Sequence, residues 1–197
     1  MKTFRSLFVL AVWGAACVSA QKHEIGLTLG RIAPNDRTSQ LRAEGGVALQ
    51  ANYGGRITDG ECAALYGEVH FLANPLRHVS GAGFIARDFS SLYVTPGLRL
   101  KFNPKGRFQP YGVIGGGYAL YENSTFLSNG AANLGERHTH TWAADFGGGI
   151  DIPVWRFLTV RGEVRDFITG NPGYNVSVPG SQHNIVAGGG FLLRFGE

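Results

Sequence analysis

The chain has 197 residues, of which 44% are hydrophobic and 16% are charged, and its formal net charge is +4 at pH 7. It contains 30 glycines and 8 prolines, a glycine content about twice the roughly 7% that is usual in proteins. This composition excludes a disordered tail, a coiled coil and a disulfide-rich miniprotein, and the length suits one domain with a sizeable buried surface.

Residues 1–20 have the features of a signal peptide. Lys2 and Arg5 supply a positive start, and the apolar run 7–13 is shorter than the roughly 20 residues that a membrane-spanning helix needs. The segment ends on the small residues Val-Ser-Ala, which match the site that signal peptidase cleaves. We therefore expect residues 21–197 to form one exported domain.

The two cysteines bear on export and on disulfides. A lipoprotein signal ending at Cys17 is the less favoured alternative, because Gly14 stands where that signal has an aliphatic residue. After cleavage only Cys62 remains, so no internal disulfide can form, and we expect a small buried or half-buried thiol. Removal of Lys2 and Arg5 also lowers the net charge to +2, and basic residues do not gather with aromatic ones. Nucleic acid is therefore not an expected partner.

Alternation of apolar and polar residues predicts eight strands in the mature chain. In segment 91–102, for example, Leu98 and Leu100 alternate with Arg99 and Lys101, which places apolar and polar side chains on opposite faces of a strand. In chain order, the predicted strands are 25–30, 47–54, 65–71, 91–102, 110–121, 144–152, 158–165 and 185–195. No window reads as an amphipathic helix, so the prediction is an all-β fold.

The connections between these strands alternate in length. Short turns are expected at 57–60, at 103–106 and around 153–155, where Asp-Gly and Asn-Pro favour turns. Long polar connections are expected at 33–45, 74–90, 122–140 and 168–181. Short turns at one end and long loops at the other are typical of a transmembrane β-barrel.

A soluble barrel of the lipocalin kind also alternates, with its apolar face inward, so further features are needed. The signal peptide, the loop lengths, the strand lengths and the final aromatic Phe195 favour the membrane. Aromatic residues near strand ends would form interfacial girdles; they are Tyr53, Phe71, Phe102, Tyr111, Tyr121, Trp142, Trp155, Phe157 and Phe167. We therefore expect Leu98, Leu100, Val160 and Leu193 to face lipid.

The opposite face carries charges of both signs, which a narrow lumen must pair. These residues are Glu68, His70, Arg99, Lys101, Asp145, Asp151, Arg161, Glu163, Arg165 and Arg194. In an eight-stranded barrel such side chains fill the interior, so no wide pore is expected.

Four segments combine glycine, aromatic and charged residues in a pattern that resembles the small outer-membrane β-barrels of the OmpA/OmpX type. These segments are 91–100, 110–117, 145–151 and 160–165. The resemblance spans the mature chain and implies an eight-stranded antiparallel up-and-down transmembrane β-barrel in the bacterial outer membrane. It also implies contact with outer-membrane lipid and lipopolysaccharide, insertion by the outer-membrane assembly machinery, and a monomer. One departure is that Gly196 and Glu197 follow Phe195, whereas family members often end on Phe.

Two histidine-containing stretches could carry chemistry. His78 and Ser80 form a His-x-Ser pair, an arrangement found in some outer-membrane lipid A deacylases, but no Glu follows nearby to orient the histidine. His138 and His140 could share one strand face with Glu136 as a third metal ligand, yet metal sites usually need three or four ligands. We expect ordinary polar surface at both places.

Two further groups are expected to be structural. His70 and Glu68 should fill the interior. The triplets 115–117 and 188–190 are glycines inside strands with no following helix, so they favour close strand packing and not phosphate binding. No catalytic residue, cofactor or metal is therefore expected.

The predicted function is a non-enzymatic barrel acting through its four long loops, toward a ligand that the sequence does not identify. The second and third loops offer aromatic and charged residues: Arg77, His78, Phe84 and Arg87, and Tyr121, Phe126, Glu136, Arg137 and His138. The alternatives are an outer-membrane lipid-modifying enzyme of the lipid A deacylase kind and a soluble exported lipocalin-like binder.

Overall fold

A computed structural model describes residues 23–38, 41–81, 85–175 and 180–196 of the protein. The predicted signal peptide, with Cys17, and the loop residue Phe84 lie outside these described residues. Within them, no helix is long and apolar enough to cross a membrane.

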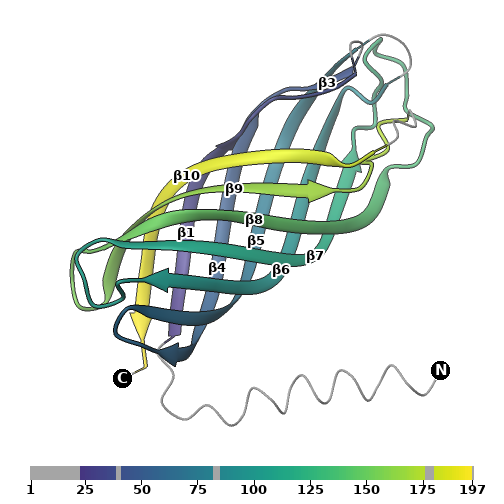
Figure 1. The fold of residues 1–197 in the computed structure, drawn as a ribbon. Coiled ribbons are helices and arrows are strands. Elements are labelled where there is room, and N and C mark those ends of the chain that lie inside the picture. Colours follow the sequence, from purple (N-terminus) through teal and green to yellow (C-terminus); the bar gives the residue numbers. More distant parts are fainter. Residues whose placement is uncertain (1–22, 39–40, 82–84, 176–179, 197) are drawn as a thin grey trace, which may run out of the picture.

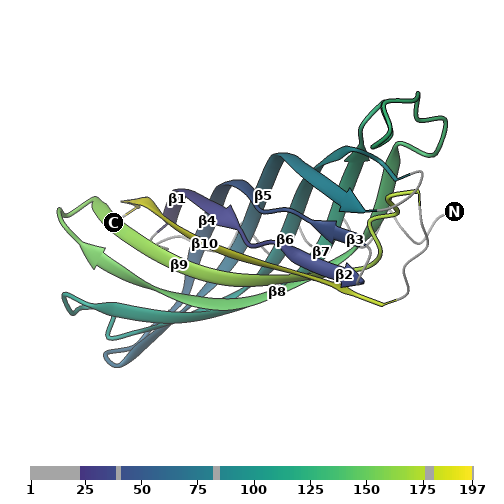
Figure 2. The same cartoon turned by 90° about the horizontal axis from the view of Figure 1, so that it is seen from above.

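Eight long antiparallel strands wind around one axis to form a barrel, as Figures 1 and 2 show. They are β1 (His23–Ile32), β4 (Gly46–Asp59), β5 (Ala63–Gly81), β6 (Asp88–Phe102), β7 (Gln109–Asn123), β8 (His138–Pro153), β9 (Leu158–Thr169) and β10 (Gln182–Phe195). Each pairs with its neighbours in chain order, and β1 pairs with β10 from His23↔Phe195 to Ile32↔Val186. Because this last pairing closes the ring, the predicted eight-stranded up-and-down barrel is confirmed.

The two ends of the barrel differ. The β4–β5, β6–β7 and β8–β9 connections, at 60–62, 103–108 and 154–157, lie at the same end as the start of β1 and the end of β10 (Figure 1). We call this the turn end. The other four connections lie at the opposite end, which we call the loop end.

The loop end is more ordered than the sequence predicts. The prediction of a long connection at 74–90 is wrong, because β5 continues to Gly81 and β6 begins at Asp88. A β-bulge lies between Asn74 and Arg77, where Pro75 and Leu76 oppose the single residue Ser90. Proline lacks the N–H that a ladder needs and is found at bulges, so the hairpin continues beyond it.

The first long connection also contains strands. β2 (Asn35–Thr38) and β3 (Leu41–Ala43) form a small hairpin, and β3 pairs with the extended part of β5, from Leu41↔Gly81 to Ala43↔Val79. The sheet therefore continues into the loop end, where Figure 1 shows β3.

Side chains alternate between the lumen and the outer wall as the period of two requires. Leu98, Leu100, Val160 and Leu193 point outward with 38–49% of their surface exposed, whereas Arg99 and Arg161 are buried. A lipocalin-like barrel has the reverse arrangement, with its apolar face inside. The predicted lipid-facing residues are therefore on the outer wall.

Some aromatic residues and Cys62 differ from expectation. Tyr111, Tyr121 and Phe167 were expected in the girdles but are buried in the lumen, because the strand register puts them on the inward face. Tyr53, Phe71, Phe102, Trp142, Trp155 and Phe157 are exposed on the outside, as predicted. Cys62 is exposed in the β4–β5 turn and is not a buried thiol.

Close approach of neighbouring strands explains two of the intrastrand glycines. A Cβ at Gly117 would collide with the carbonyl oxygen of Val94, and one at Gly190 with that of Leu27. Any other residue would push the paired strands apart there.

Candidate functional site

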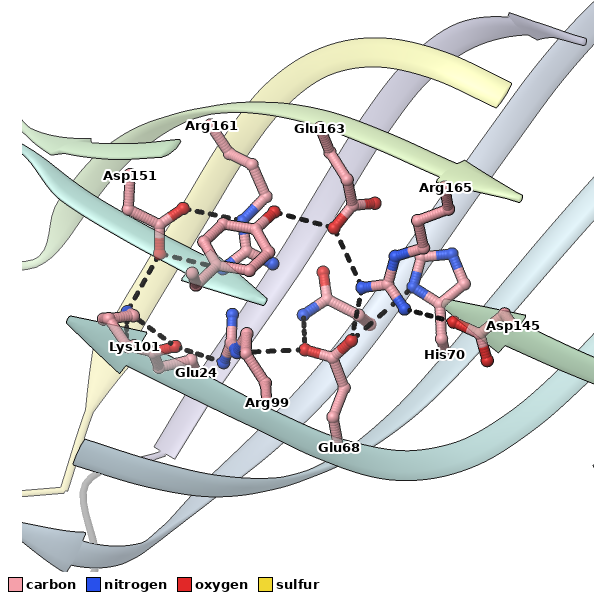
Figure 3. Close-up of polar contacts among 12 residues, drawn as sticks. Glu24, Glu68, His70, Arg99, Lys101, Asp145, Asp151, Arg161, Glu163 and Arg165 are labelled. Carbon is pink, nitrogen blue, oxygen red and sulfur yellow. Dashed lines mark hydrogen bonds and ion pairs between the residues drawn. The ribbon is translucent and has the colours of Figure 1, made fainter. Parts of the chain in front are cut away.

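The middle of the lumen is filled by a network of ion pairs between strands (Figure 3). Strand β9 supplies Arg161, Glu163 and Arg165, whose alternate spacing sends all three inward. The two arginines pair with carboxylates on β5 and β8, and Glu163 contacts Arg165 and Tyr111, which lies on β7.

In the half of the network that lies nearer the loop end, Arg165 is the cation with the most ion pairs. Its guanidinium contacts the carboxylates of Glu68 at 2.5 Å, Glu163 at 2.8 Å and Asp145 at 2.9 Å. The Tyr111 hydroxyl donates a hydrogen bond to Glu163 at 2.7 Å. Bonds from three strands therefore converge on one cation, as Figure 3 shows.

The half nearer the turn end is built around two carboxylates. Arg161 donates two hydrogen bonds to Asp151, at 2.8 and 2.9 Å, and Lys101 Nζ lies 2.9 Å from Asp151. Glu24 accepts from Arg99 at 2.6 Å and from Lys101 at 2.9 Å. Arg99 Nε also lies 3.2 Å from Glu68, which links the two halves.

The network is electrically balanced. Five cationic side chains (Arg99, Lys101, Arg161, Arg165 and Arg194) face five carboxylates (Glu24, Glu68, Asp145, Asp151 and Glu163). Arg194, at the turn end, is half-buried, and the other nine are buried. Buried charges persist where partners compensate them, so the balance allows these ten side chains to fill the lumen.

The sequence identified every member of this network except Glu24. Glu24 was missed because the first predicted strand begins one residue later, at Ile25. In the structure Glu24 and Gly26 lie on the same, inward-facing side of β1. His70, predicted as interior filling, is buried and lies 3.2 Å from the Gln50 side-chain oxygen.

A second buried cluster closes the lumen at the loop end. Arg77, which the sequence placed in a loop, is fully buried there. It donates to the carbonyl oxygens of Glu44 at 2.8 Å and Ala33 at 3.3 Å, and to Asn184 Oδ1 at 2.8 Å. Its guanidinium also lies 5.2 Å from the centre of the Phe89 ring. One side chain of β5 thus joins both ends of the β1–β4 connection to β10.

Aromatic side chains pack beneath and around Arg77. Phe89 contacts Tyr174, with ring centroids 4.8 Å apart, and Tyr93 contacts Tyr121 and Phe167. Tyr174 comes from the connection between β9 and β10 and is buried. We call Arg77 and these aromatic residues the cap.

The outer surface of the loop end carries a groove of about 310 Å³ beside the cap. Its lining includes Leu76, Arg87, Phe126 and Arg137. The Arg87 guanidinium lies 5.6 Å from the Phe126 ring centre, and Arg137 pairs with Glu122 at 2.7 Å. Mixed aromatic and charged side chains are therefore presented at the surface.

Two carboxylates that the sequence analysis did not identify contact the His-x-Ser pair. His78 Nδ1 contacts the carboxylate of Asp88, which lies opposite it across the β5–β6 pairing. The Ser80 hydroxyl donates to Glu44 at 2.7 Å. Asp88 lies ten residues after His78 and was missed because only a Glu was sought, whereas Glu44 comes from a distant segment that a local search could not reach. His78 and Ser80 share the outward face of β5.

The second histidine pair has no third metal ligand at Glu136. His138 and His140 share the exposed face of β8, and Glu122 lies opposite His138. His140 contacts the Tyr118 hydroxyl. Across the part of the chain that the structure describes, no group of three or more His, Cys, Asp or Glu side chains could hold a metal ion.

Comparisons with known proteins are consistent with this geometry. The family described as outer membrane protein β-barrel domain matches residues 8–191. No curated protein matches the chain.

Several solved structures share the fold. The outer membrane protein OprG from Pseudomonas aeruginosa is 16% identical with a TM-score of 0.55, and 91% of this chain covers 98% of that one. Neisserial surface protein A is 13% identical with a TM-score of 0.55, over 88% of this chain and 97% of that one. The N-terminal β-barrel domain of Pseudomonas aeruginosa OprF is 12% identical with a TM-score of 0.50, over 88% and 97%. These likenesses concern the fold alone.

Proposed function

This chain belongs to the family of outer membrane protein β-barrel domains, and from that premise we propose that it is a non-enzymatic barrel whose loop end makes its interactions. The bacterial outer membrane is its location. Longer loops of such barrels face the outside of the cell and short turns face the periplasm. The proposal therefore places the groove lined by Arg87, Phe126 and Arg137 at the cell surface.

The observation that carries the proposal is the capped, ion-filled barrel. Pairing between Arg165, Glu68 and Asp145 fills the middle of the lumen, and the cap closes the loop end. A barrel filled in this way suits the role of a scaffold better than that of a channel, because side chains occupy the space that a pore needs. Rigid scaffolds that present surface residues suit binding.

The same reasoning extends to partners. The exposed apolar wall fits outer-membrane lipid, with lipopolysaccharide around the loop end, and the outer-membrane assembly machinery would insert the chain. A ring closed by β1 and β10 leaves no free barrel edge for another subunit, which favours a monomer. The ligand of the surface groove is unidentified.

Loop shortening tests the proposal. Replacing 79–87 and, separately, 124–137 by tight turns should preserve the ring of eight strands and the cap residues Arg77 and Phe89. A heat-modifiable shift on SDS gels would report the intact barrel. The phenotype of a deletion strain should then remain unrescued. A matched control replaces the β4–β5 turn 60–62 at the other end by an Asn-Gly turn and should rescue. Rescue by both loop-shortened variants would refute a function at the loop end.

A second candidate function, hydrolysis of a lipid ester, is favoured by the contact between His78 and Asp88. A carboxylate at Nδ1 leaves Nε2 as the base for a serine hydroxyl, and Ser80 stands on the same strand face. The Ser80 hydroxyl, however, is directed to Glu44. Lipid A deacylation by wild type that is lost in Ser80→Ala and retained in His138→Ala would establish this enzyme and refute the non-enzymatic proposal.

A further inference from the structure

The turn end of the barrel contains a half-enclosed pocket of about 250 Å³. Four cationic residues line it, Arg56, Lys105, Arg156 and Arg194. Arg56 and Arg194 point into the barrel mouth from β4 and β10 and are half-buried, whereas Lys105 and Arg156 stand exposed on two separate turns. Positive charge from four separate segments is therefore gathered around one opening.

The two carboxylates in the lining are already occupied. Glu24 is contacted by Arg99 at 2.6 Å, by Lys101 at 2.9 Å and by Arg194 at 3.3 Å. Asp59 pairs with Arg56 at 2.7 Å. Among the lining residues, four cations therefore face two carboxylates, and Lys105 also lies 3.6 Å from Glu61, an exposed residue outside the lining. The lining itself carries an excess of positive charge.

We propose that this pocket binds a phosphate group. Arginine presents a planar fork of N–H donors that matches phosphate oxygens, and lysine adds a flexible point charge. The volume accommodates a phosphate together with the first atoms of the molecule that carries it. The buried ion pairs around Glu24 form the floor, so the ligand would close the mouth without entering the lumen.

The source of the phosphate depends on the orientation proposed above. With the turn end in the periplasm, the ligand is a free phosphate compound or the headgroup of a phospholipid in the inner leaflet. Binding itself does not depend on the orientation, so failure of one proposal leaves the other open to its own test.

Titration of the folded full chain in zwitterionic detergent with inorganic pyrophosphate tests the site. Wild type should show saturable shifts of the Arg56, Gly196 and Arg194 resonances in NMR spectra. The double variant Lys105→Gln/Arg156→Gln should bind at least about tenfold more weakly, because two of the four cations are gone. These residues are exposed turn residues, so the barrel should still show its heat-modifiable gel shift.

The matched control is Arg87→Gln/Arg137→Gln, which removes two exposed arginines at the loop end and should bind like wild type. Nanodiscs separate the two sources. If phosphatidylglycerol nanodiscs suppress pyrophosphate binding and phosphatidylcholine nanodiscs do not, a lipid headgroup is the ligand. Equal binding in both supports a free phosphate compound. Linear, non-saturating shifts in wild type, or equal losses in both double variants, would overturn the proposal.

Discussion

Asp151 is the carboxylate on which buried Arg161 depends, because Arg161 directs both of its hydrogen bonds to it. Asp151→Ala should therefore lower the free energy of unfolding by about 3–5 kcal/mol, the usual cost of breaking a buried pair. Arg165 is different, since it contacts three carboxylates. Glu163→Ala should cost less, about 1–3 kcal/mol. Urea unfolding of the two variants in lipid vesicles measures the difference, and an equal or reversed order would contradict it.

Arg77 should matter for the cap and not for the barrel. It is buried without a carboxylate among its three hydrogen-bond acceptors, two of which lie in the β1–β4 connection and one on β10. Arg77→Met removes all three bonds while filling much of the same volume. We expect faster protease cleavage near residues 33–44 and an unchanged heat-modifiable gel shift. Protection equal to wild type would show that the aromatic residues hold the cap alone.

The outward face of β6 gives a prediction for a whole strand. Leu98→Arg should destabilise the folded barrel by about 2–4 kcal/mol, because the charge would face the middle of the lipid layer. Leu76→Arg is a matched control: Leu76 is also exposed, at 53%, but lies past the bulge toward the loop end. Reversible unfolding in bilayers compares them, and similar costs at both positions would place Leu98 outside the membrane.

The bulge in β5 makes a second prediction about strands. Deleting Pro75 leaves Leu76 alone opposite Ser90, so Arg77 still points inward and the barrel should assemble. Deleting Val164 from β9, whose pairings contain no bulge, shifts the register by one residue and turns Arg165 and every later side chain of that strand to the other face. We expect that second deletion to abolish the cap or the barrel. Gel shift and proteolysis distinguish the two deletions, and a barrel that tolerates the Val164 deletion would contradict the pairing.

The whole molecule should be a poor conductor of ions. Its lumen is occupied by balanced ion pairs, and the cap covers the loop end. Planar bilayers holding the purified protein should show no steady channel of the size that a wide porin gives, with such a porin as the positive control. Large, stable openings in wild type would show that the lumen network opens in the membrane.

The sequence determined the fold class and the two faces of the barrel. Alternation is a local property, so segments such as 91–102 and 158–165 reveal by themselves which residues share a face. Membrane placement needed further features of the sequence, the signal peptide, the alternating loop lengths and the final aromatic residue, because a soluble barrel alternates in the same way with its apolar face inward. Alternation could not show that the connection expected at 74–90 is a hairpin, since a bulge interrupts the period there.

Only the tertiary structure decided which side chains meet. Asp88 lies opposite His78 only because the hairpin continues past the bulge, and Glu44 reaches Ser80 from a segment 36 residues away in the chain. Glu24 joins Arg99 across the lumen, 75 residues away in the chain. Such contacts depend on the stagger between strands and on closure of the ring by β1 and β10, which no local pattern encodes. The barrel could therefore be predicted from period-two alternation, whereas the lumen network, the cap and the turn-end pocket required the closed ring.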